Sequence, residues 1–317
     1  MKIVIPGGSG QVGQILGRAF QNDGHEVVIL SRRIESNAAG RVVVWDGRTL
    51  GDWTRELEAA DVVINLVGKS VNCRYTAANR REITQSRVDS TNAVGQAIAG
   101  ARRPPGLWLQ AATATIYAHR YDAAHDEIFG FLGGNEEDVP ETWRFSIEVA
   151  KAWERAFNHA PPSPSTRKVL MRSAVILSPD AGGIFDVLLG LVRLGLGGRV
   201  GDGRQYVSWI HDIDFIRAIR WLVAHKNLEG VINLASPNPL PNTHFMRILR
   251  EAWKTRIGLP ASKWMLEIAT FFMRTETELV LKSRRVIPGR LLHDGFKFEF
   301  PDWNGAARDL CRRWRSM

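Results

Sequence analysis

Three glycines near the amino terminus have the spacing of a dinucleotide-binding loop. Gly7, Gly10 and Gly13 follow the apolar run of residues 2–5 and lie three positions apart. Such a loop needs glycine because the turn is tight, the backbone approaches a pyrophosphate, and the next helix packs close to the strand. The helix then presents N–H groups and a partial positive charge to the phosphates. The spacing therefore predicts a loop that binds a dinucleotide.

The end of the next predicted strand indicates which dinucleotide this is. An NAD site commonly has a carboxylate there, about 20 residues past the loop, which binds the ribose 2′-hydroxyl. This chain has Ser31, Arg32 and Arg33 instead. A guanidinium binds a 2′-phosphate through charge-assisted hydrogen bonds, whereas a carboxylate would repel it. We therefore predict NADP(H) as the cofactor; the alternative is that both arginines are simply solvated.

Repeated strands and helices must position these residues. A strand, the glycine loop, a helix with apolar residues at helical spacing and a second strand at 26–31 form a βαβ unit. Further strands are predicted at 41–47, 61–68, 107–113, 171–177 and 230–236, with a long helix from about 76 to 100. This alternation is typical of an α/β fold with a Rossmann-type, doubly wound parallel sheet. Further cofactor contacts are expected near the strand ends, from Gln11, Val12, Asp46, Leu66 and Gly68.

Size and composition narrow the function classes. The 317 residues suit one large domain with a smaller lobe. Two cysteines far apart in the sequence favour a reducing cytoplasm, and neither a signal peptide nor a membrane span is expected. The net charge of +9 comes from arginines spread along the chain without a basic block. A small-molecule substrate is therefore expected, and nucleic acid is not an expected partner.

Six stretches carry a family resemblance. They are GGSGQVG, DVVINLVG, REITQSRVDST, RLGLGGRVGDGRQYVSWIHDID, INLASPNPLPN and RVIPGRLLHDGFKFEFPD. The chain resembles the extended short-chain dehydrogenase/reductase superfamily, in particular the YfcH-type epimerase family proteins with a short C-terminal domain of unknown function. The resemblance implies a nicotinamide cofactor, commonly NADP, and no particular substrate. It implies a Rossmann core over residues 1–177 with a contribution from 205–235, and a substrate-binding lobe over 178–204 and 236–317. A homodimer is left open.

The superfamily also implies where catalysis should occur. A serine or threonine follows the fifth strand, and a Tyr-x-x-x-Lys pair lies on the next helix; the tyrosine acts as acid and base. In the stretch TATIY, Thr113 fits the hydroxyl position and Tyr117 follows it. On the predicted helix 144–156, Ser146 and Ala150 occupy the tyrosine and lysine positions, so the pair is missing.

Three interpretations of the missing pair stay open. In the first, another tyrosine after the fifth strand, Tyr117 or Tyr121, transfers the proton. In the second, His211 supplies acid–base help from the substrate lobe. In the third, hydride chemistry is lost, and the protein is an NADP(H)-binding sensor or regulator. The first two describe an epimerase/dehydratase-like oxidoreductase that acts on a small polar substrate.

The stretch GDGRQYVSWIHDID supplies the expected substrate contacts. By resemblance, Gln205, Trp209 and His211 face a cleft between the lobes, and Arg204 could bind an anionic group of the substrate. The alternatives are that Trp209 belongs to the core and that His211 hydrogen-bonds a loop carbonyl. We predict no metal site, because His211 and its neighbour Asp212 would point to opposite faces of a strand.

Overall fold

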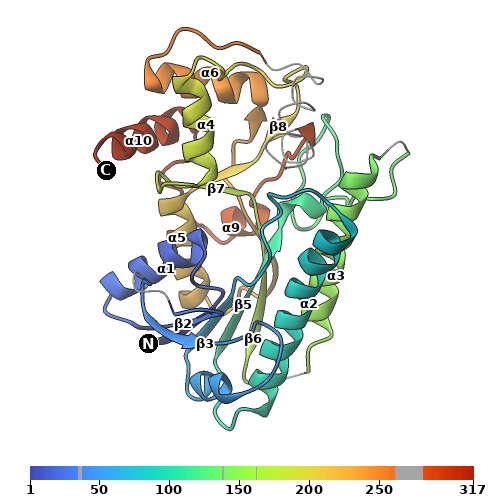
Figure 1. The fold of residues 1–317 in the computed structure, drawn as a ribbon, viewed down its shortest axis with the longest axis vertical. Coiled ribbons are helices and arrows are strands. Elements are labelled where there is room, and N and C mark those ends of the chain that lie inside the picture. Colours follow the sequence, from blue (N-terminus) through green and yellow to red (C-terminus); the bar gives the residue numbers. More distant parts are fainter. Residues whose placement is uncertain (35–37, 138, 162, 261–280) are drawn as a thin grey trace.

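A seven-stranded sheet forms the centre of the computed structural model, which describes residues 1–34, 38–137, 139–161, 163–260 and 281–317 (Figure 1). All neighbouring strands are parallel. Their order is β10 (Gly230–Leu234), β6 (Arg167–Ser173), β5 (Leu107–Thr113), β4 (Val62–Asn65), β1 (Lys2–Pro6), β2 (Glu26–Ser31) and β3 (Arg41–Val44). This order confirms the predicted Rossmann-type α/β fold. The order reverses between β1 and β4, which is where such sheets bind their ligands.

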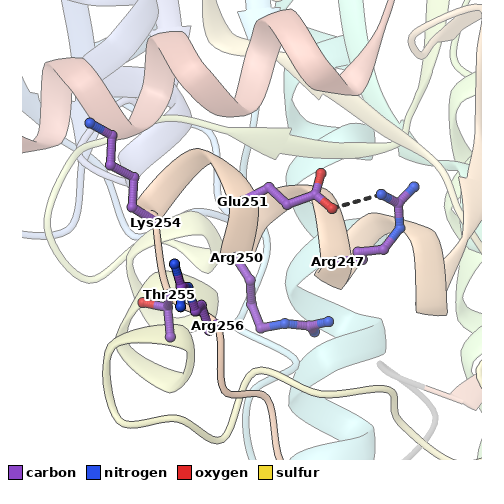
Figure 2. A pocket seen from close by; sticks show the side chains of 6 residues that line it. All are labelled: Arg247, Arg250, Glu251, Lys254, Thr255 and Arg256. Carbon is purple, nitrogen blue, oxygen red and sulfur yellow. Dashed lines mark hydrogen bonds and ion pairs between the residues drawn. The ribbon is translucent and has the colours of Figure 1, made fainter.

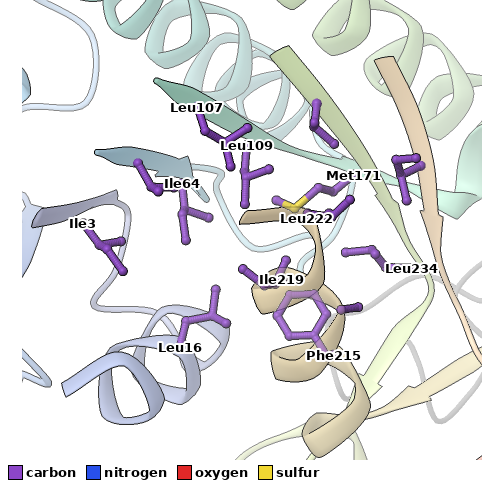
Figure 3. Packing of buried hydrophobic residues seen from close by; sticks show 14 of the residues in the cluster. Ile3, Leu16, Ile64, Leu107, Leu109, Met171, Phe215, Ile219, Leu222 and Leu234 are labelled. Carbon is purple, nitrogen blue, oxygen red and sulfur yellow. The ribbon is translucent and has the colours of Figure 1, made fainter. Parts of the chain in front are cut away.

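Helices cover both faces of the sheet (Figure 1). Helices α1 (Gln11–Asn22) and α5 (Asp212–Ala224) lie on one face, and α2 (Ala77–Gly100) and α3 (Glu141–Asn158) lie on the other. Figure 3 shows the first core, in which Leu16 of α1 and Ile219 of α5 meet Ile64 and Leu109 of the strands. Because both faces are buried, the strands are apolar on both sides.

A smaller group of elements packs above the carboxyl ends of the strands (Figure 1). It contains α4 (Ile184–Arg193), α6 (Asn242–Trp253) and α10 (Trp303–Arg315), with the short helix α9 (Gly289–His293) nearer the sheet. Phe185, Phe245 and Leu310 of the three larger helices share one buried core with Trp209. Strand β8 (Tyr206–Val207) pairs with β11 (Leu240–Pro241). Part of the predicted substrate lobe, residues 261–280, lies outside the described residues, and the predicted division into core and lobe stays a prediction.

The predicted strand at 171–177 is in fact two strands. Residues 171–173 belong to β6, whereas β7 (Val175–Leu177) pairs with β9 (Trp209–His211) in a separate two-stranded sheet. Ala174 still donates to the carbonyl of Leu234 in β10, but Val175 donates to Ser208 instead. The chain therefore leaves the main sheet at Ala174, and its apolar pattern continues because both sheets are buried.

Candidate functional site

The glycine turn brings three segments into close contact. Gly7 has a φ of +76°, and a Cβ there would lie 2.8 Å from the backbone nitrogen of Val67, after β4. A Cβ on Gly13 would lie 2.3 Å from the Cα of Gly8. Gly10 precedes the first residue of α1 and offers no side chain to cap it. The first N–H groups of α1 therefore need other acceptors, which an anion can supply.

The carboxyl end of β2 has the predicted positive charge. Ser31 is buried, and its Oγ lies 3.2 Å from the Oγ of Ser9 in the glycine turn. Arg32 and Arg33 are exposed, and their guanidinium groups make no hydrogen bond or ion pair within the described part of the chain. Both cations therefore remain available to an anion that enters beside the glycine turn.

Asp46 lies at the end of β3 with its carboxylate already in use. It accepts hydrogen bonds of 2.9 Å from the backbone N–H groups of Arg48 and Thr49, and a third from the Thr49 hydroxyl. Burial opposes ionisation of this carboxyl, but these hydrogen bonds outweigh burial and lower its pKa. Asp46 therefore stabilises its own turn, and only the remaining capacity of its oxygens could serve a ligand.

The loop after β4 is supported by a cation from α2. The Arg87 guanidinium donates to the carbonyls of Lys69 (3.1 Å) and Ile83 (2.8 Å). A Cβ on Gly68 would lie 3.1 Å from the Arg87 Cζ, so Gly68 permits this close approach. Burial lowers the pKa of Arg87 to about 10, and a charge interaction with Tyr75 partly offsets that effect. The predicted contact Leu66 lies beside the same turn, and its N–H donates to Pro6.

Gln11 is the first residue of α1, and Thr113 is the last residue of β5. A Cβ on Gly183, just before α4, would lie 2.0 Å from the Gln11 Nε2, so the Gln11 side chain reaches the lobe. Thr113 ends β5, and its hydroxyl oxygen accepts from the Thr115 N–H at 3.1 Å. Because a hydroxyl can also donate, Thr113 retains a proton that it can direct at a ligand. Val12 is partly buried against the core below α1.

Tyr117 lies in a buried polar network below the strand ends. Only 2% of the residue is exposed, and its hydroxyl donates to the Asn233 Oδ1 at 2.9 Å and accepts from Arg172 at 3.0 Å. Arg172 also forms a bidentate ion pair with Glu154 on α3. Burial raises the pKa of Tyr117 despite the nearby Arg172. A hydroxyl held in this way is poorly placed to exchange a proton with a substrate, so the geometry does not support the predicted catalytic role.

A different tyrosine, Tyr75, contacts the helix α3. The Tyr75 hydroxyl lies 3.3 Å from the Oγ of Ser146 on α3, the residue that the resemblance implies at the superfamily's tyrosine position. Tyr75 comes from the loop before α2 and is 8% exposed. The sequence pattern did not identify it, because Tyr75 and Ser146 are 71 residues apart and neither belongs to a motif with the other.

Two of the predicted substrate residues do not face an open surface. Trp209 is fully buried in the core that it shares with α4, α6 and α10, where its ring lies 5.1 Å from that of Trp303. His211 is fully buried and stacks on Phe300 at 4.0 Å. Burial lowers the pKa of His211, although Asp212 opposes this shift. Both residues connect the core to the C-terminal segment, so we do not include them in the proposed substrate site.

The other two predicted substrate residues differ from each other. Gln205 is buried, and its amide donates to the Val200 carbonyl at 3.0 Å. Arg204 is exposed, and its guanidinium lies 5.3 Å from the centre of the Tyr121 ring. Arg204 is therefore the one of the four whose charge can reach a ligand directly.

A hollow of ≈ 430 Å³ lies elsewhere, at the end of α6, and Figure 2 shows the side chains that line it. Arg250, Lys254 and Arg256 line it, and Arg247 forms an ion pair with Glu251 at 2.7 Å. Its lining comes from α6 and the residues that follow it. The described residues contain no group of three His, Cys, Asp or Glu side chains that could hold a metal ion. They also contain no helix with the length and apolar character needed to cross a membrane.

The sequence and the fold are similar to those of known epimerase family proteins. Residues 3–132 match the NAD dependent epimerase/dehydratase family, and residues 261–310 match a domain of unknown function, DUF1731. The epimerase family protein SDR39U1 of Bos taurus is 30% identical over 98% of this chain and 99% of its own length. The epimerase family protein YfhF of Bacillus subtilis is 28% identical over 98% of each chain. The crystal structure of human SDR39U1 (isoform 2) with NADPH has a TM-score of 0.85 and 27% identity, covering 98% of this chain and 99% of that one.

Proposed function

Because this chain belongs to the epimerase family, with a matching NAD dependent epimerase/dehydratase segment, we propose that it binds NADP(H) at the glycine turn. The observation that carries the proposal is the pair of exposed cations, Arg32 and Arg33, at the strand end where an NAD site would have a carboxylate. The turn itself suits the pyrophosphate, and the two arginines suit a 2′-phosphate. That human SDR39U1 was solved with NADPH supports this choice.

The activity that we propose is oxidoreduction of the epimerase/dehydratase type on a small polar substrate. A bound nicotinamide cofactor supplies hydride transfer. Thr113 would orient a substrate hydroxyl or carbonyl group at the end of β5. Two residues of the C-terminal segment hold the turn that follows: Lys282, which is buried, donates to the Thr115 carbonyl at 2.6 Å, and the Arg284 Nε donates to the Thr115 hydroxyl at 3.3 Å. The exposed guanidinium of Arg204 favours a substrate that is anionic.

Nucleotide binding tests the cofactor assignment directly. Affinities for NADPH and NADH would be measured by calorimetry on the wild type and on Arg32→Ala and Arg33→Ala. Loss of a charge-assisted hydrogen bond should weaken NADPH binding by about tenfold to a hundredfold and leave NADH binding unchanged. Arg247→Ala removes an exposed guanidinium on α6 and is the matched control. An unchanged ratio of NADPH to NADH affinity in both β2 variants would refute the assignment.

A second function, an NADP(H)-binding sensor without turnover, is favoured by one observation. The superfamily's Tyr-Lys positions are occupied by Ser146 and Ala150, and the Tyr117 hydroxyl is held in the buried network. NADPH oxidation in the presence of pooled metabolites separates the two functions. Oxidation by the wild type that is lost in Thr113→Val supports the enzyme, whereas tight NADPH binding without any isotope exchange or oxidation supports the sensor.

A further inference from the structure

Tyr75 brings a phenol to the helix face from which the superfamily tyrosine is missing. Its hydroxyl lies 3.3 Å from the Ser146 Oγ, and its ring packs edge-on against Phe145 at 4.9 Å. One turn further along α3, Ala150 packs against Ala114 and Ile116, which directly follow Thr113. This face of α3 therefore lies beside the end of β5, where the proposed function places the substrate.

A partly buried cation interacts with the same phenol. Arg87 interacts electrostatically with Tyr75, and its guanidinium also lies against Gly68 of the proposed cofactor loop. It stacks on the Trp153 ring at 5.0 Å, and no carboxylate within the described residues forms an ion pair with it. A cation held by carbonyls and a ring, without a carboxylate partner, favours negative charge on a nearby group.

We propose that Tyr75 is the acid–base residue of this protein, and that Arg87 takes the place of the missing lysine as its positioning cation. The inference rests on the proposed function. In the oxidising direction, the substrate O–H bond breaks and its proton converts the Tyr75 phenolate to the phenol. The C=O bond forms, and the hydrogen on carbon leaves with both bonding electrons to the oxidised nicotinamide. Reduction reverses each transfer.

Three arginines of the described residues lie near Tyr75 in the chain or in space. Arg87 and Arg80 face it from α2, and the Arg80 Nε donates to the Tyr75 carbonyl. Arg80 pairs with Glu141 at the start of α3, so Arg80 is largely neutralised. Arg74 precedes Tyr75 on the same loop. Of these described groups, Arg87 is the cation whose charge acts on the phenol without a carboxylate partner.

The test uses the charge difference between the two cofactor forms. A phenolate beside the nicotinamide attracts NADP⁺, which carries a positive ring, but not NADPH. The ratio of the two dissociation constants, NADP⁺ over NADPH, should therefore fall roughly tenfold between about pH 6 and about pH 10 in the wild type. The 2′-phosphate is common to both forms, so its titration cancels in the ratio.

Variants assign this dependence to one residue. Tyr75→Phe keeps the ring and should make the ratio independent of pH, whereas Tyr121→Phe, which removes a more exposed phenol, should retain the wild-type dependence. Arg87→Gln should move the fall to higher pH, an effect that a purely structural role would not produce. Thermal unfolding by circular dichroism verifies that each variant is folded.

Each negative result has a distinct meaning. Tight NADPH binding with a ratio that does not change with pH, or a dependence that persists in Tyr75→Phe, would overturn the inference and leave the proposed function intact. Failure of the wild type to bind either nucleotide would overturn the proposed function and this inference together.

Discussion

Replacement of Tyr117 by phenylalanine should destabilise the protein without affecting its chemistry. The substitution removes one oxygen that donates to Asn233 at 2.9 Å and accepts from Arg172 at 3.0 Å. The ring and its stacking on His125 at 5.1 Å remain. A neutral hydrogen bond contributes about 1 kcal/mol and one to a charged group about 1.5–3 kcal/mol. Arg172 keeps its bidentate pair with Glu154, so the expected loss in free energy of unfolding is about 2–3 kcal/mol.

Urea unfolding followed by tryptophan fluorescence measures this loss. The midpoint should fall while the dependence on urea concentration stays constant, because the surface exposed on unfolding does not change. The control is Tyr121→Phe, since Tyr121 is 36% exposed and its loss should change stability by less than about 0.5 kcal/mol. A change below about 0.5 kcal/mol for Tyr117→Phe, with loss of NADPH oxidation, would refute the structural interpretation and restore Tyr117 as a catalytic candidate.

Two further predictions concern the glycine turn and the response to pH. Gly13→Ala places a Cβ 2.3 Å from backbone of the turn and should weaken NADPH binding by about tenfold or more, whereas Gly190→Ala, which meets no atom within 4 Å, should not; calorimetry on both checks this. His125 accepts from the Phe131 N–H through Nδ1, and burial lowers its pKa, so its neutral form belongs to the folded state. The free energy of unfolding should therefore fall as pH decreases from about 6.5 through the folded-state pKa, and His125→Gln should reduce this fall in urea titrations; an equal fall in the variant would contradict the assignment.

The sequence predicted correctly those helices and turns whose start or shape is decided by residues a few positions apart. The long helix expected from about 76 is α2, and Thr76 caps it by accepting from the Asn79 N–H. The glycine spacing predicted the tight turn between β1 and α1, because sterics within a few residues decide such a turn. The strand at 171–177 was wrong in its details, since an apolar run looks the same whether it continues one sheet or enters another.

In the candidate site, too, the positions of some side chains could be predicted from the sequence and those of others could not. Arg32 and Arg33 could be placed from the sequence alone, because parallel strands in a βαβ unit all end at one edge of the sheet. Trp209 and His211 could not, since the sequence does not show whether an aromatic residue after a glycine-rich loop faces a ligand or a neighbouring helix. Their burial depends on Trp303 and Phe300, which lie about ninety residues further along the chain.

By itself, then, the sequence determined the α/β fold through its repeated alternation of strands and helices. It also determined the tight glycine turn and the cations after β2, both of which follow from contacts within one βαβ unit. Only the tertiary structure decided which tyrosine meets α3. The sequence pointed to Tyr117 because it follows the fifth strand, but packing buries Tyr117 between Asn233 and Arg172 and directs Tyr75 to Ser146. The physical reason is that the surroundings of a side chain are set by residues distant in the chain. A sequence pattern shows the spacing of apolar residues but not which distant residues they contact.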